Sequence, residues 1–272
     1  MKNIIKITVL LLFTAYAPDI LAVDTDPVRG VENIPEWLHA DPFYKKYYDA
    51  DGIPVISSGA VRDEALVATG EVISRMLSKC AEVKKAMVQG RVKFMVIGEH
   101  ENVSDIPEYK YFCNTPERAA YWNQRARGFG GAPEGDQSAS CGEENVLCLP
   151  GDRYRGESIL VHEFAHIIHS AGIAKVHPEF DEELESLRLK AIEEGLWKDT
   201  YAITNKEEYF AEAVQSFFNC NRYSEIPDGI HNRIDTREKL RQYDPRIYRL
   251  LLRFFEETDL GLCSANAKSD TL

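Results

Sequence analysis

The most constraining feature of the sequence is an apolar run at residues 157–170 (ESILVHEFAHIIHS), which is typical of a buried helix but carries ionisable side chains. His162 and His166 are one helical turn apart, so both imidazoles leave the same face of the helix, and Glu163 projects beside them. Neutral imidazoles in an apolar segment need hydrogen-bond partners or a metal ion. Another element must therefore bring polar groups to this face.

The H-E-x-x-H spacing lets the two histidines share one ion, and zinc is the metal that it suits best. Glu163 would then point at the water molecule that the ion holds. The alternative is that hydrogen bonds in the core satisfy both histidines without any metal. A catalytic zinc site usually has three protein ligands and leaves the fourth position to water, so a third ligand is needed.

Two further histidines follow the motif. His169 lies seven residues after His162, so the two rings start about 10 Å apart along the helix axis and cannot meet on one ion. The longer metzincin motif H-E-x-x-H-x-x-G-x-x-H is also absent. His177, in an expected turn, stays open as an alternative ligand.

Acidic residues offer the better candidates. The helix expected at residues 205–219 carries Glu208 and Glu212, one turn apart on a partly apolar face. Carboxylates at such positions are costly unless they are paired or bound to a metal. The alternative is that both glutamates are solvated. The acidic run at 181–185 is typical of a solvent-facing surface.

The first 22 residues have the pattern of a cleaved signal peptide. Lys2 precedes an apolar run, Ile7 to Ala15, and small residues lead to a cleavage site after Ala22. The run is shorter than the ~20 residues that span a bilayer. Cleavage after Ala17 and a retained membrane anchor are the alternatives. We expect a secreted or periplasmic protein.

Residues 23–272 are expected to form one domain, with the aromatic stretch 23–60 packed on the body as an N-terminal extension. Helical periodicity covers 61–85, and the run 91–98 (RVKFMVIG) is typical of a buried strand. Glycine-rich loops follow, within which Asn145–Leu149 is a second strand candidate.

Helical patterns dominate the rest of the chain, at residues 157–170, 181–194, 206–219 and 237–257, with a break at Pro245. Strands come early and helices late. The order predicts an α+β fold with a small N-terminal sheet and a mainly helical C-terminal part.

The chain has six cysteines, at positions 80, 113, 141, 148, 220 and 263. An even number in an exported protein predicts up to three disulfides, whose pairing the sequence does not determine. Cys141 and Cys148 are close enough in sequence to close one loop. No C-x-x-C pair exists, which argues against a cysteine zinc site or a thioredoxin-type motif.

Charge excludes two classes of partner. The formal net charge is −12, and removing residues 1–22 would leave −13. Such a surface repels phosphate, so neither nucleic acid nor a stable association with a membrane is expected.

Arg125 and Arg127 could pair with a carboxylate of the substrate. The simpler expectation is that they pair with acidic residues of the protein surface. His231 is a further candidate for a transition-state donor, although a surface loop position is the simpler expectation.

The H-E-x-x-H segment and the helix with Glu208 and Glu212 together make the sequence resemble the anthrax lethal factor-like zinc metallopeptidases, a branch of the gluzincins. The resemblance consists of His162-Glu163-Phe164-Ala165-His166 and of Tyr201-x6-Glu208-Tyr209-Phe210-Ala211-Glu212, in order. It covers roughly a quarter of the chain, from Gly156 to Cys220. The receptor-binding and translocation regions of the toxin have no counterpart in this chain.

The resemblance implies a zincin-like catalytic domain in which His162, His166 and Glu208 bind Zn²⁺. It also implies that Glu163 activates the attacking water and that Tyr201 hydrogen-bonds the developing oxyanion. Glu212 would orient a histidine ligand.

The sequence thus predicts a secreted zinc metallopeptidase that acts on proteins or peptides and is a monomer. The substrate would lie extended along an edge strand, for which Asn145–Leu149 is the candidate. One alternative is a secreted binding protein or pseudoenzyme that retains a zinc site. Another is a structural zinc protein, in which four protein ligands would close the site.

Overall fold

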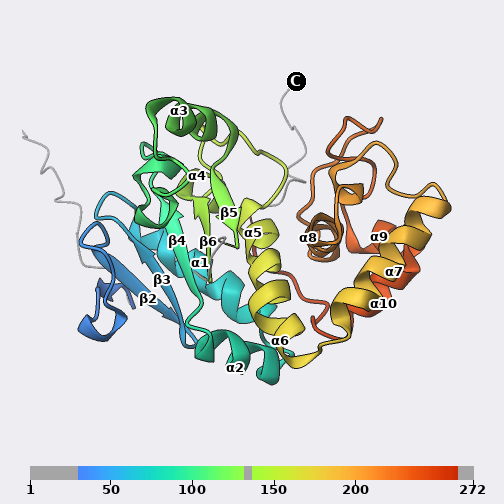
Figure 1. Ribbon diagram of the computed structural model, residues 1–272, viewed down its shortest axis with the longest axis horizontal. Helices are drawn as coiled ribbons and strands as arrows, with labels where there is room; N and C mark the ends of the chain where they lie inside the picture. The colour runs from blue at the N-terminus through green and yellow to red at the C-terminus, as the bar shows by residue number, and fades with distance from the viewer. Residues whose placement is uncertain (1–29, 132–136, 263–272) are drawn as a thin grey trace, which may run out of the picture.

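The computed structural model describes residues 30–131 and 137–262 of the chain. The expected signal peptide, residues 1–22, and Cys263 lie outside these described ranges. Figure 1 shows a sheet on one side of the molecule, the C-terminal helices on the other, and helix α5 (Ile159–Ile167) between them.

The described strands form one mixed sheet in the order β1-β2-β3-β4-β6-β5. Its three central strands, β3, β4 and β6, are parallel, whereas β5 pairs antiparallel with β6 and forms an edge. The strands are β1 (Glu32–Asn33), β2 (Lys46–Ala50), β3 (Ile53–Ser57), β4 (Lys93–Ile97), β5 (Gly128–Gly130) and β6 (Ser138–Gly142).

Most of the chain after β6 is helical, which confirms the predicted α+β class with its early sheet and its helical C-terminal part. The α-helices are α1 (Asp63–Met76), α2 (Ala81–Gln89), α3 (Pro116–Arg125), α4 (Glu143–Val146), α5, α6 (Ala174–Val176), α7 (Phe180–Glu193), α8 (Lys206–Phe217), α9 (Arg237–Tyr243) and α10 (Pro245–Leu251). A π-helical segment, η5 (Ile168–Ile173), continues α5, and short 3-10 turns are η1 (Glu36–Leu38), η2 (Val103–Asp105), η3 (Pro107–Tyr109) and η6 (Tyr201–Ile203).

Buried apolar residues lie on both faces of the sheet, because successive side chains of a strand point to opposite sides. On β4, Phe94 and Val96 belong to the larger cluster, which α1, α5 and α8 cover. Met95 and Ile97 belong to a smaller cluster with residues of η2 and η3. The sheet is therefore covered on both faces, as a run of consecutive apolar residues such as FMVI requires.

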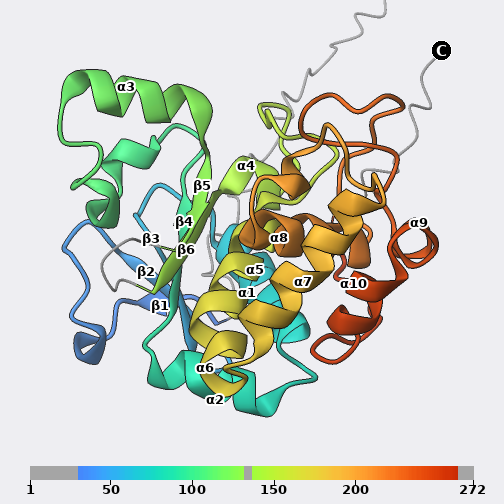
Figure 2. The ribbon, with the colours of Figure 1, turned by 45° about the vertical axis from the view of Figure 1, so that its right-hand side comes forward.

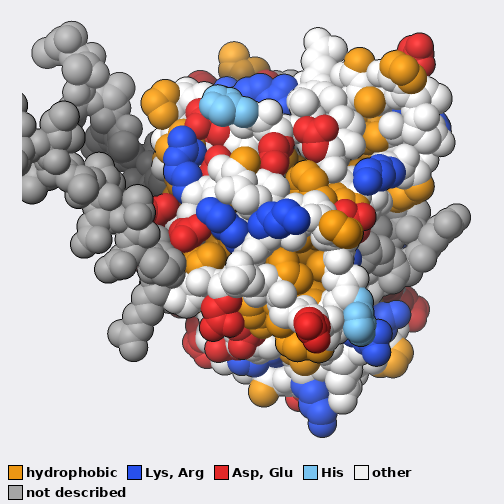
Figure 3. All heavy atoms as spheres, turned by 90° about the vertical axis from the view of Figure 1, so that its left-hand side faces the viewer, with side chains coloured by type: hydrophobic (Ala, Val, Ile, Leu, Met, Phe, Trp, Pro, Cys, Tyr) orange, Lys and Arg blue, Asp and Glu red, His pale blue; other side chains and the backbone are white. Residues whose placement is uncertain are grey.

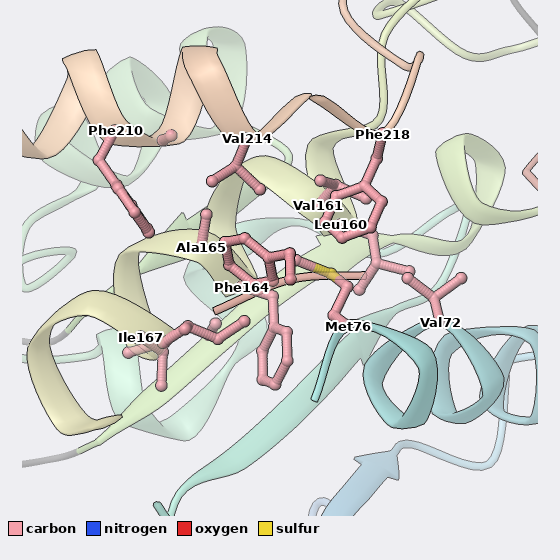
Figure 4. Packing of buried hydrophobic residues seen from close by; sticks show 14 of the residues in the cluster. Val72, Met76, Leu160, Val161, Phe164, Ala165, Ile167, Phe210, Val214 and Phe218 are labelled. Atoms are coloured by element: carbon pink, nitrogen blue, oxygen red, sulfur yellow. The ribbon is translucent and has the colours of Figure 1, made fainter. Parts of the chain in front are cut away.

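Helix α5 lies at the centre of the larger cluster. Figure 4 shows Phe164 and Ala165 of α5 beside Val214 of α8, with Met76 of α1 on the opposite side. Figure 2, turned from the first view, shows α1 and α8 again beside α5. Because α5 touches β5, β6 and α8, it ties the sheet to the C-terminal helices.

The N-terminal aromatic stretch contributes strands to the sheet itself. From residue 30 onward it supplies β1, β2 and β3; Tyr44 is buried, whereas Trp37 stays exposed.

The side of the molecule that lies left in Figure 1 has Lys and Arg side chains interspersed with Asp and Glu (Figure 3). Among the described helices, none combines the length and the apolar character needed to cross a membrane.

Two sequence predictions of local structure are wrong. The helix expected over 61–85 is divided into α1 and α2, because the backbone leaves the helical conformation at Cys80. The strand expected at Asn145–Leu149 does not form, since Asn145 and Val146 belong to α4. The Asn145 side chain bonds the main chain of Glu157 and Ile159, and such local side-chain bonds compete with strand pairing.

The sequence predicted up to three disulfides, and fewer form than that upper limit. Cys80, Cys113, Cys141 and Cys220 are free cysteines, so the expected loop between Cys141 and Cys148 is not closed by a disulfide. Cys141 lies fully buried within β6, where it packs as a small apolar side chain of the larger cluster.

The core can be tested by one pair of leucine variants. Leu66 of α1 is fully buried, whereas Leu189 of α7 is 52% exposed. Leu66→Ala is expected to lower the free energy of unfolding by about 2–5 kcal/mol, because it removes buried methyl groups and leaves a cavity. Leu189→Ala is expected to change it by less than about 0.5 kcal/mol. Urea unfolding followed by circular dichroism measures both, and equal effects would contradict the assigned core.

Candidate functional site

The site is built on α5, whose first turn is fixed by hydrogen bonds. Ser158 caps the helix by accepting from the Val161 amide. The following residues place His162 and His166 on one face, where the two Nε2 atoms are 3.2 Å apart. The one-turn spacing of H-E-x-x-H therefore has its expected geometric result.

Helix α8 brings a carboxylate to the same point. Asn205 caps α8 by accepting from the Glu208 amide at 2.7 Å. One oxygen of the Glu208 side chain lies 3.1 Å from His162 Nε2 and 3.5 Å from His166 Nε2. The structure thus brings together the two histidines and the glutamate that the resemblance singled out, and their ligand atoms all lie within 4.8 Å of one another.

Gln215 sets the orientation of His162. Its Nε2 donates to the Ser158 carbonyl at 3.1 Å, which leaves the amide oxygen 2.8 Å from His162 Nδ1. An amide oxygen only accepts, so Nδ1 keeps a proton and Nε2 is the nitrogen that faces Glu208. Without a metal Nε2 also carries a proton and donates to Glu208, and a bound cation would take the place of that proton. The centre is then a convergence of electron-pair donors, which a cation satisfies.

The spacing of these donors fits zinc. Ligand atoms bound at about 2.0–2.2 Å to one tetrahedral zinc ion lie about 3.3 Å from one another. The three separations here are 3.1, 3.2 and 3.5 Å. Two imidazole nitrogens and one carboxylate oxygen are also a donor set typical of catalytic zinc sites.

The electrostatics of the centre attract positive charge. Burial by itself lowers the pKa of His162, but the hydrogen bond to Glu208 and the nearby carboxylates outweigh it and raise the pKa to about 10. Burial likewise opposes the charge of Glu208, yet the hydrogen bonds to both histidines hold its pKa well below the usual value. The negative potential of these carboxylates would also stabilise a bound divalent cation.

Glu163 lies between the paired histidines and the edge strand β5. Burial raises its pKa, while the charges of His162 and His166 and a hydrogen bond from the Gly130 main chain oppose the shift. A Cβ atom on Gly130 would lie only 2.3 Å from the Glu163 carbonyl oxygen. The glycine therefore lets β5 approach α5 closely.

Tyr201 enters from η6 and is 41% exposed. Burial of its phenol and the adjacent Glu208 carboxylate, to which the hydroxyl is hydrogen-bonded, raise the pKa of Tyr201 to about 12. The hydroxyl therefore keeps its proton at neutral pH and acts as a donor beside the three converging groups.

Glu212 lies near His162, but a different residue makes the hydrogen bond. The Glu212 carboxylate is 3.6 Å from His162 Nδ1 and accepts from Asn221 at 3.0 Å, whereas the Gln215 oxygen is at 2.8 Å. Sequence reasoning missed Gln215. Its position seven residues after Glu208, two turns along the same helix face, is the signal that could have found it.

The histidines that follow the motif lie away from the centre. His169 Nε2 is 2.6 Å from an Asp181 carboxylate oxygen. His177 pairs loosely with Glu82 at 3.5 Å. Neither belongs to the group of possible metal ligands found among the described residues.

His231 lines the same cavity as the three converging groups, which has a volume of about 920 Å³. It is buried, and its Nε2 lies 3.0 Å from a Glu157 carboxylate oxygen. It is therefore not the surface loop residue that the sequence suggested as the simpler case. Tyr201, Glu163, the β5 residues Gly128 to Gly130 and the following Gly131 also line this cavity.

Comparisons with known proteins find little. No family model matches the sequence, and no curated protein matches it. Among solved structures, the PRO-PRO endopeptidase PPEP-2 from Paenibacillus alvei is similar at 16% sequence identity with a TM-score of 0.48, over 74% of this chain and 97% of that chain. Similarity at this level is too slight to transfer an activity.

The orienting role of Gln215 leads to a test on metal binding. Gln215→Ala removes the acceptor of His162 Nδ1, so the ring loses its fixed orientation and tautomer. We expect zinc affinity to fall about 10- to 100-fold, as measured by competition with a chromogenic chelator. Gln89→Ala, at an exposed position at the end of α2, is the matched control and should leave the affinity unchanged. Equal affinities in the two variants would contradict the role.

Proposed function

We propose that this protein is an exported zinc-dependent metallopeptidase. One observation carries the proposal: nitrogen atoms of His162 and His166 and a carboxylate oxygen of Glu208 converge at separations of 3.1–3.5 Å, which suit one tetrahedral zinc ion. When bound, zinc lowers the pKa of a water molecule to about 7 and polarises a carbonyl group.

Glu163 is the residue placed to move the proton. It follows His162 on α5, is not itself one of the converging ligands, and lines the cavity. Burial raises the pKa of its carboxyl group, which makes the carboxylate a stronger base. In the proposed reaction Glu163 accepts a proton from water and passes it to the leaving amine nitrogen.

Tyr201 supplies the hydrogen bond for the developing oxyanion. Its pKa of about 12 keeps the phenol protonated, and the partly exposed residue lines the cavity beside Glu208. A positioned donor of this kind typically contributes about 3–4 kcal/mol to transition-state stability.

Strand β5 offers the seat for a peptide in place of the predicted Asn145–Leu149. Within the described residues it pairs with β6 on one side only, and its residues line the cavity beside Glu163. An extended peptide can add to such an edge by main-chain hydrogen bonds, which favours substrates that are unfolded segments or loops.

Export rests on the signal-like pattern of residues 1–22. Protein recovered from culture supernatant or periplasm should begin at Val23, and N-terminal sequencing that finds residues 1–22 retained would contradict this part of the proposal. The alternative of a structural zinc site is less well supported, because the converging group among the described residues has three members rather than four.

The proposed chemistry is tested by Glu163→Gln. The amide cannot accept the proton from water, so we expect hydrolysis of a mixed peptide library to fall at least about 100-fold. Zinc content should stay at the wild-type level, because Glu163 is not one of the converging ligands. Glu182→Gln, at an exposed position on α7, is the matched control. Full turnover in Glu163→Gln, with zinc bound, would contradict the role of Glu163, whereas a wild type that binds zinc but cleaves no peptide would favour the alternative of an inert zinc site.

A further inference from the structure

The cavity of the proposed active site is lined by arginines as well as by acidic residues. Two of these arginines are fully engaged. The buried Arg127 donates to both Glu144 carboxylate oxygens and to two main-chain carbonyls. Arg153 donates to the main-chain carbonyls at the end of α3. Their guanidinium groups serve the fold.

Arg125 differs from both. It is the last residue of α3, is exposed, and lines the cavity. Within the described part of the chain, no carboxylate or carbonyl oxygen accepts a hydrogen bond from its side chain. Its guanidinium carbon lies over the Tyr121 ring, 5.1 Å from the ring centroid. Stacking of this kind uses the flat face of the guanidinium and leaves its in-plane N–H donors free.

The position of Arg125 is fixed by its surroundings. Its own carbonyl accepts from the Tyr154 hydroxyl at 2.8 Å, which holds the end of α3. Tyr121 packs edge-on against Trp122, whose ring contacts Phe129 of β5. The free donors therefore stand beside a row of aromatic rings that leads to the proposed peptide-binding strand.

The acidic residues of the cavity already have partners. Glu157 pairs with His231, and Glu212 accepts from Asn221. Arg222 is also exposed in the cavity, and no described residue accepts a hydrogen bond from its side chain either, but no described aromatic ring lies against its guanidinium. Arg125 is the cavity-lining arginine that combines open donors with a stacking contact in the described structure.

We infer that Arg125 binds a carboxylate of the substrate, so that the enzyme prefers peptides with Asp or Glu at one position near the cleaved bond. The inference rests on the proposed peptidase function. A planar fork with two parallel donors matches a carboxylate, whereas an amide of the same shape offers one acceptor and no charge. The preference should weaken with salt, because Arg125 is exposed.

The test uses pairs of quenched fluorescent peptides that differ only by Glu or Gln at each position around a cleaved bond. For wild-type protein at low ionic strength, we expect kcat/KM to be about fivefold higher for Glu at one position, the size typical of an exposed ion pair. The difference should lie mainly in KM. Arg125→Gln should bring the ratio to one, and Arg125→Glu should make a Lys peptide the better substrate.

Arg249→Gln is the matched control, since Arg249 is exposed on a helix and lies outside the cavity. It should keep the wild-type ratio. A ratio near one at every position in the wild type, or a ratio that Arg125→Gln leaves unchanged, would overturn the inference while hydrolysis itself still supports the proposed function. Failure to cleave any peptide, with zinc bound, would instead contradict the proposed function on which the inference rests.

Discussion

The arrangement depends on an otherwise apolar contact between α5 and α8 in which three electron-pair donors face one point. Two imidazole nitrogens and a carboxylate oxygen would each be costly to bury without a partner. Gln215 makes the requirement stricter, because its bond to His162 Nδ1 leaves Nε2 as the nitrogen that faces inward. A cation at this point satisfies all three, so metal binding and packing of α8 on α5 are expected to stabilise each other.

The two sides of the molecule supply different parts of the proposed chemistry. The helical side provides the metal ligands and Tyr201, whereas the sheet side provides the edge strand β5. Close approach of the sides is possible because Gly130 has no side chain to separate β5 from Glu163. At the rim, Arg125 ends α3 just before β5 begins, which places a charged donor beside the path of an extended peptide.

Local periodicity predicted the C-terminal helices α5, α7, α8, α9 and α10 and the one-turn spacing of His162 and His166, because these depend on residues near in sequence. The strand at Asn145–Leu149 was wrong because side-chain bonds from Asn145 decide the local conformation there. The upper limit of three disulfides is not reached, because an even count says nothing about where a cysteine lies, and Cys141 is free and buried in β6. Gln215 was missed because an uncharged amide is not marked out by its chemistry, and its hydrogen bond to His162 exists only once α8 packs against α5.

Zinc binding by the purified protein tests the central claim most directly. Wild-type protein dialysed against trace zinc should retain one zinc per chain by plasma mass spectrometry, and Glu208→Ala should lower the affinity more than ~100-fold while circular dichroism still shows a folded chain. A folded wild type that binds no zinc would contradict the account. So would a Glu208→Ala variant that binds zinc as tightly as the wild type.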